Sequence, residues 1–166
     1  MRKLIGLTAF AVAVATTQLT AQGTVAVPRN PANLGLQASW ADDADFGIGI
    51  RYENDVHKVI SGAPQKLHFI IAFDYFFPEI VETYYEGNIN LTYQFGDQRR
   101  AIGPYLGGGL NIARVENAGA SNTDLGLNIL GGLRFRSASR MVPFVEARFE
   151  AGGGEQFVIT AGLLFF

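Results

Sequence analysis

Residues 85–95 read YEGNINLTYQF, and side chains of one kind recur at every second position. The apolar positions are Tyr85, Ile89, Leu91, Tyr93 and Phe95, and the polar positions between them are Glu86, Asn88, Asn90, Thr92 and Gln94. A period of two residues is typical of a β-strand, because successive side chains point to opposite faces of the sheet. This stretch therefore predicts a strand with one apolar face and one polar face.

The same alternation recurs from residue 33 to the end of the chain, in segments separated by clusters of Gly, Asp, Asn, Ser and Pro. It predicts eight strands, over residues 34–40, 46–53, 67–76, 85–95, 102–112, 125–136, 144–150 and 156–166. We expect an all-β fold, an eight-stranded antiparallel up-and-down transmembrane β-barrel, with both chain ends on its periplasmic side because the number of strands is even. In the last strand both faces are apolar, and we expect Val158, Leu164 and Phe166 to point outward.

The turn-forming clusters predict where the strands are connected. Outside connections are expected near residues 41–45, 77–83, 114–124 and 151–155, and periplasmic turns over 54–66, 96–100 and 137–141. The first periplasmic connection is long, so the second strand could run on to about Ile60 and turn over 61–65.

The sizes of the side chains indicate which face points outward. An eight-stranded barrel has an interior just wide enough to be filled by side chains, and stacks such as Phe69, Ile71 and Phe73 from every strand would overfill it. We therefore expect the apolar faces to lie in lipid, with aromatic residues near the strand ends, and the polar faces to fill the lumen. The expected lumen charges are Arg51, Glu53, Asp74, Glu86, Arg134, Arg136, Glu146, Arg148 and Glu150. Opposite charges in so narrow a space should pair into a plug, which we favour over an open pore.

Composition excludes several classes of protein. The 166 residues suffice for one domain, and the net charge of −2 leaves no basic footprint for nucleic acid. The chain has no cysteine, so disulfides, thiol chemistry and Cys-ligated zinc are excluded.

The N-terminus has the order of a secretory signal. Arg2 and Lys3 are followed by an apolar stretch up to about Ala15 and then by small and polar residues up to Ala21. We expect a signal peptide over residues 1–21, removed on export, and a barrel domain over 22–166.

Three motifs give the chain a family resemblance. They are GPYLGGG at 103–109, PFVEAR at 143–148 and the terminal GLLFF at 162–166. With them the chain resembles the small outer-membrane β-barrel proteins of the outer membrane protein A and X type. The resemblance implies a bacterial outer-membrane location, contact with outer-membrane lipid and lipopolysaccharide, a monomeric state, and recognition of Phe166 by the barrel-assembly machinery. It implies no shared enzymatic activity, so it indicates architecture better than role.

Three features of the sequence could form chemical sites. His68 and Asp74 could join a serine in acyl transfer, as in barrel lipid-A deacylases, but neither His57 nor His68 has a serine two residues away. The acidic Asp42, Asp43 and Asp45 could bind a divalent cation, although a solvated turn explains them as well. Glycines 152–154 lack the Lys-Ser/Thr ending of a phosphate-binding loop. We therefore expect no catalytic residue, cofactor or metal.

The sequence favours a non-enzymatic outer-membrane barrel with a structural or surface-interaction role through its outside loops, chiefly residues 114–124. The alternatives are a narrow channel for ions or small solutes, a soluble periplasmic carrier of hydrophobic ligands with the facing reversed, and a lipid-A-modifying barrel enzyme.

Overall fold

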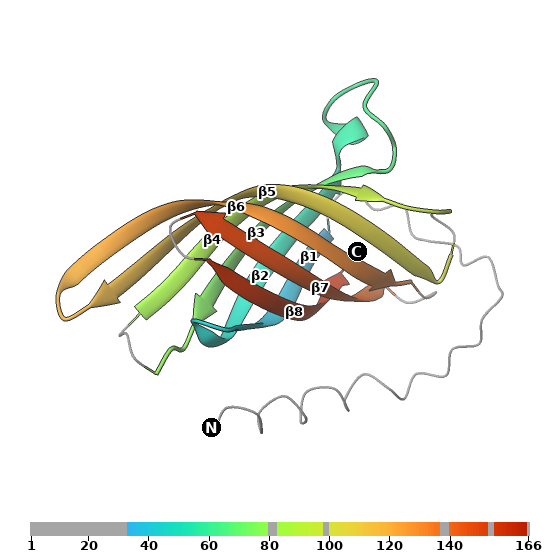
Figure 1. Ribbon diagram of the computed structural model, residues 1–166. Helices are drawn as coiled ribbons and strands as arrows, with labels where there is room; N and C mark the ends of the chain where they lie inside the picture. Colours follow the sequence, from blue (N-terminus) through green and yellow to red (C-terminus); the bar gives the residue numbers. More distant parts are fainter. Residues whose placement is uncertain (1–32, 80–82, 98–99, 137–139, 153–154, 166) are drawn as a thin grey trace.

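Eight antiparallel strands form one closed barrel in the computed structural model, which describes residues 33–79, 83–97, 100–136, 140–152 and 155–165 (Figure 1). The strands are β1 (Asn33–Ala41), β2 (Asp45–Asp55), β3 (Leu67–Phe76), β4 (Thr83–Gln94), β5 (Ile102–Asn117), β6 (Ala120–Phe135), β7 (Met141–Gly152) and β8 (Gln156–Phe165). Each strand pairs with the next, and β1 pairs with β8 from Leu34↔Phe165 to Ala41↔Val158, which closes the barrel. This confirms the predicted fold class.

The barrel has two unlike ends. The start of β1, the end of β8 and the connections after β2, β4 and β6 lie at one end, which we call the terminal end. The connections after β1, β3, β5 and β7 lie at the other, which we call the loop end. The β5–β6 hairpin projects furthest at the loop end, away from the C mark in Figure 1. Among the described residues, no helix has the length and apolarity needed to cross a membrane.

One predicted connection is wrong, and so is the alternative extension of the second strand, whose connection lies within the predicted 54–66. Residues 114–124 are not a loop, because β5 and β6 continue through them as a ladder that ends at Asn117↔Ala120. The second strand does not reach Ile60; it ends at Asp55, where a 3-10 helix, η2 (Val56–Lys58), begins. The other connections fall near the predicted positions, and the predicted signal peptide and Phe166 lie outside the described residues.

The two faces of the wall differ as the alternation predicts. Along β6, Leu127 and Ile129 point outward and are 61% and 67% exposed, whereas Asn128 between them points inward and is 3% exposed. The facing expected for the last strand is wrong: Val158 and Leu164 are buried inside, and Phe157, Ile159 and Leu163 point outward. The outer wall is thus apolar around the barrel, and the lumen is mostly polar.

Aromatic rings gather near both ends of the outer wall. At the loop end Phe77 stacks on Phe46 and meets Tyr75 edge to face, with ring centroids 6.3 and 5.0 Å apart. At the terminal end Tyr93 meets Phe95 at 5.4 Å. These positions suit the two interfacial belts of a barrel that spans a bilayer.

Candidate functional site: the barrel lumen

The charged side chains predicted to face the lumen lie inside the barrel. Eight of them are at most 4% exposed, namely Arg51, Glu53, Asp74, Glu86, Arg134, Glu146, Arg148 and Glu150. Arg136 follows β6 at the terminal end, is half-buried, and donates to Gln94 Oε1. The buried charges form two clusters, one in each half of the lumen.

The cluster nearer the terminal end connects opposite walls. Arg51 on β2 donates from Nη1 to Glu146 Oε2 on β7 at 2.9 Å and lies 3.3 Å from Glu53 Oε2. Arg134 on β6 reaches Glu53 Oε1 at 2.6 Å. The Tyr105 hydroxyl donates to Glu146 Oε2 at 2.8 Å. These contacts join β2, β5, β6 and β7, although β2 does not pair with any of the other three strands in the sheet.

Aromatic rings complete this cluster from the inward face. The Arg51 guanidinium carbon lies 4.4 Å from the ring centroid of Phe144, and that of Arg134 lies 3.9 Å from the centroid of Tyr105. A desolvated guanidinium over an aromatic ring gains about 2 kcal/mol. Gly132 makes room for Tyr105, because a Cβ there would collide with its hydroxyl oxygen.

His68 lies at the terminal edge of the same cluster. It points into the lumen, is 8% exposed, and its Nδ1 lies 2.9 Å from Asp55 Oδ1 and 4.0 Å from Glu53 Oε1. Asp74, its suggested catalytic partner, belongs to the other cluster. The structure therefore does not bring these two residues together as an acyl-transfer pair.

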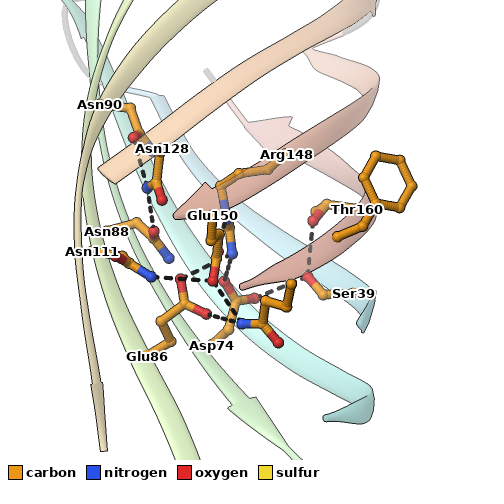
Figure 2. Close-up of polar contacts among 12 residues, drawn as sticks. Ser39, Asp74, Glu86, Asn88, Asn90, Asn111, Asn128, Arg148, Glu150 and Thr160 are labelled. Carbon is orange, nitrogen blue, oxygen red and sulfur yellow. Dashed lines mark hydrogen bonds and ion pairs between the residues drawn. The ribbon is translucent and has the colours of Figure 1, made fainter. Parts of the chain in front are cut away.

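The cluster nearer the loop end surrounds Arg148 (Figure 2). Its guanidinium lies 2.5 Å from Glu150 Oε1, 3.1 Å from Glu86 Oε1 and 3.9 Å from Asp74 Oδ2. Asp74 Oδ1 also accepts from Gln37 Nε2 at 2.8 Å and from Ser39 Oγ at 3.0 Å. One guanidinium group thus lies within 4 Å of three carboxylates.

Amide side chains beside this cluster connect β4 with β6 and β5 with β7. Asn128 Nδ2 on β6 donates to Asn88 Oδ1 and Asn90 Oδ1 on β4, at 2.7 and 2.9 Å. Asn111 Nδ2 on β5 donates to Glu150 Oε2 at 3.1 Å. Figure 2 shows these side chains extending the polar network along the inner wall. Side chains therefore occupy the lumen in both halves.

The acidic turn considered for a cation has other partners. Asp42 Oδ1 accepts the Phe157 backbone N–H at 2.8 Å, and Asp45 Oδ2 accepts that of Glu79 at 3.4 Å. In the part of the chain that the structure describes, no group of three His, Asp or Glu side chains is placed to hold a metal ion.

Sequence reasoning singled out the charges of the lumen but not the neutral side chains that organise them. Tyr105 and Phe144 hold the arginines, and Gln156 Nε2 contacts Glu150 Oε2 at 2.6 Å and Glu86 Oε2 at 3.2 Å. Tyr105 and Phe144 have the inward parity predicted for their strands, so strand parity could have identified them, whereas Gln156 has the parity that was expected to point outward in the last strand.

No protein-family model matches the sequence, and no curated protein matches it significantly. Solved structures do match. The N-terminal β-barrel domain of Pseudomonas aeruginosa OprF aligns with a TM-score of 0.62 at 12% identity, over 80% of this chain and 96% of that one. Neisserial surface protein A aligns with a TM-score of 0.58 at 17% identity, over 81% and 94%. The outer membrane enzyme PagL aligns with a TM-score of 0.53 at 12% identity, over 81% and 99%. At these identities the likeness shows the fold, which is that of small outer-membrane barrels.

Proposed function

We propose that this protein is a non-enzymatic outer-membrane barrel whose lumen is plugged, with a structural or surface-interaction role exerted through its loop end. The observation that carries the proposal is the contrast between an apolar outer wall and a lumen crossed by paired charges. The proposed surroundings of the barrel are outer-membrane lipid and lipopolysaccharide. The barrel-assembly machinery is the proposed partner during insertion, and the monomer is the proposed working state.

The outer wall supports placement in a bilayer. Large aliphatic side chains such as Leu36, Ile89 and Ile129 are each at least 60% exposed. A wall of this kind would be unstable in water but is favourable in hydrocarbon. Closure of the barrel leaves no unpaired strand edge within the wall, as hydrocarbon requires.

The lumen supports a plug rather than a channel. Arg51–Glu146 and Arg148–Glu86 each join strands that do not pair with each other. Opening a path would separate buried charges, and an uncompensated buried charge costs about 3–5 kcal/mol. We therefore expect the barrel to show no stable ion conductance.

The position of His68 favours a non-enzymatic role over acyl transfer. His68 faces the lumen and is engaged with Asp55, so it is turned away from the lipid in which a lipid-A substrate would lie. The residues two positions from it are Lys66 and Ile70, neither of which is a nucleophile of the serine type.

Two measurements test the proposal. Membrane fractionation with gel migration before and after heating should recover a heat-modifiable protein from the outer membrane, whereas recovery from the soluble periplasmic fraction would refute the location. Planar-bilayer recording should show no stable unitary conductance. A conductance altered by Glu146→Ala or Arg134→Ala would instead establish a channel.

Enzymatic activity is tested separately with the purified protein in detergent. We expect no release of acyl chains from lipid A. Turnover that disappears in His68→Ala would overturn the non-enzymatic assignment.

A further inference from the structure

A hollow of about 130 Å³ opens at the loop end of the lumen, above the Arg148 cluster. Its polar lining comes from the β1–β2 turn and from strands β4, β5, β6 and β8, as Asp43, Tyr84, Asn111, Asp124 and Gln156. The volume is below the roughly 300–1,000 Å³ of pockets for drug-sized ligands, so the hollow suits a small molecule or one end of a larger one.

The ionisable groups around this hollow are mostly acidic. Asp43 and Asp124 stand in its wall, and none of the described residues that line it is Lys, Arg or His. Beneath it the single guanidinium of Arg148 faces three carboxylates, from Asp74, Glu86 and Glu150. A concave site lined by one sign of charge concentrates ions of the opposite sign.

Two carboxylates and a hydroxyl group converge on a single amide nitrogen here. Gln156 Nε2 lies near three acceptors, Glu150 Oε2 at 2.6 Å, the Tyr84 hydroxyl at 2.8 Å and Glu86 Oε2 at 3.2 Å, but an amide nitrogen carries only two hydrogens. The amide hydrogens of Gln156 therefore cannot satisfy all three contacts.

Asn111 gives an independent indication of a missing donor. Its side chain is 6% exposed, and its Oδ1 has no hydrogen-bond partner among the residues that the structure describes. A buried acceptor without a partner costs about 1–3 kcal/mol. This oxygen lies beside Gly126, which also lines the hollow, and a Cβ at Gly126 would collide with it.

From these observations we infer that the hollow is a binding site for a small organic cation with several N–H donors, of the diamine or polyamine class. The cation pairs with the Asp43 and Asp124 carboxylates in the wall, and its N–H groups supply donors to these carboxylates and to Asn111 Oδ1. An elongated cation fits better than a metal ion, because the carboxylates are divided between wall and floor and do not converge on one point in the described structure.

The inference depends on the proposed function only for placing the hollow on the cell surface. Binding to the purified barrel requires no particular cellular location. A failure of membrane fractionation and a failure of ligand binding are therefore separate results.

The test is a calorimetric titration of the full-length barrel in detergent with 1,4-diaminobutane and with spermidine, together with NMR of the Gly126 and Gly152 amides. We expect saturable binding that weakens with added salt, and shifts of both amide signals. Asp124→Asn should weaken binding by roughly five- to tenfold, since it removes one charged acceptor. Gly126→Ala should weaken binding strongly, because its Cβ would occupy part of the hollow and displace Asn111 Oδ1 without changing any charge.

Glu116→Gln is the matched control. Glu116 lies on the outward face of the same hairpin, paired with Arg114 Nη2 at 3.0 Å, so its removal changes the net charge as Asp124→Asn does but outside the hollow. It should leave binding unchanged. Heat-modifiable migration checks that each variant is folded. Equal weakening by both charge variants, tight binding by folded Gly126→Ala, preference for Ca²⁺ or Mg²⁺ over the diamine, or no binding at all would each overturn the inference.

Discussion

Arg51 Nη1 and Glu146 Oε2 lie 2.9 Å apart across the lumen, and both side chains are almost completely buried. Their strands, β2 and β7, do not pair in the sheet, so this ion pair is a direct connection between distant parts of the wall. Glu146 also accepts from Tyr105, which lies against Arg134. Loss of the glutamate would therefore leave two buried partners unsatisfied.

Glu146→Ala should lower the free energy of unfolding by about 3–5 kcal/mol, because it leaves Arg51 and Arg134 to share the single carboxylate of Glu53, so that one buried positive charge is uncompensated. Urea unfolding of the barrel refolded in detergent or lipid vesicles measures the change. The double variant Arg51→Met with Glu146→Leu should recover most of the loss, since it removes both charges. Glu116→Gln, in an exposed pair, should change stability by less than about 1 kcal/mol. A double variant as unstable as the single one would show that the pair itself is not what stabilises the lumen.

Arg148→Met should destabilise the barrel most at high pH. It leaves Asp74, Glu86 and Glu150 close together with no guanidinium, and their mutual repulsion costs stability as long as they are ionised. Lowering the pH protonates these carboxyls and relieves the repulsion, so the difference from the unmodified protein should shrink. Unfolding midpoints in urea measured from about pH 9 down to about pH 4 check this. A difference that stays constant over this range would contradict it.

The strand order and the facing of most side chains could be predicted because lipid and lumen impose opposite requirements on neighbouring residues. Ile89 and Asn90, for example, follow each other in β4 and point to opposite faces. The pairing of charges across the lumen could not be predicted in this way. It depends on which side chains of non-neighbouring strands meet at the same height, and alternation within a strand carries no such information.

Two errors of prediction have physical causes. Beyond the wall the outward face of the β5–β6 hairpin is polar, as Arg114 illustrates, and its inward face is mixed, as Val115 and Asn122 illustrate. The alternation of outward apolar and inward polar residues therefore disappears although the ladder continues. In β8 the inward face is partly apolar. Leu164 packs with Val142 and Phe144, and Val158 packs with Phe76. These small apolar clusters at the ends of the lumen obscure the alternation of polar and apolar residues along the strand.

Replacing an outward residue by arginine should reveal the depth of the bilayer. Ile129 lies near the middle of the wall in β6, and Leu125 lies four residues toward the loop end, about 14 Å along the tilted strand at about 3.4 Å per residue. Ile129→Arg should cost about 2–4 kcal/mol in folding into vesicles, and Leu125→Arg about 0–1 kcal/mol. Both side chains are more than 60% exposed, so the two substitutions should remove similarly few packing contacts. Equal costs at the two positions would contradict a bilayer centred on the middle of the wall.

Ala118→Asn should stabilise the projecting hairpin. Ala118 and Gly119 form its two-residue turn with φ values of 49° and 81°, and such turns require positive φ at both positions. Alanine in this region costs roughly 1–2 kcal/mol, whereas asparagine adopts it readily. We expect a gain of about 1 kcal/mol, confined to the hairpin because residues 120–125 of β6 extend past the last pairing with β7. Amide hydrogen exchange over residues 113–124 should therefore slow by about fivefold while exchange in β1 and β8 stays unchanged, and Ala118→Val should have the opposite effect. Uniform slowing throughout the barrel, or none in the hairpin, would show that this turn is not the limiting element.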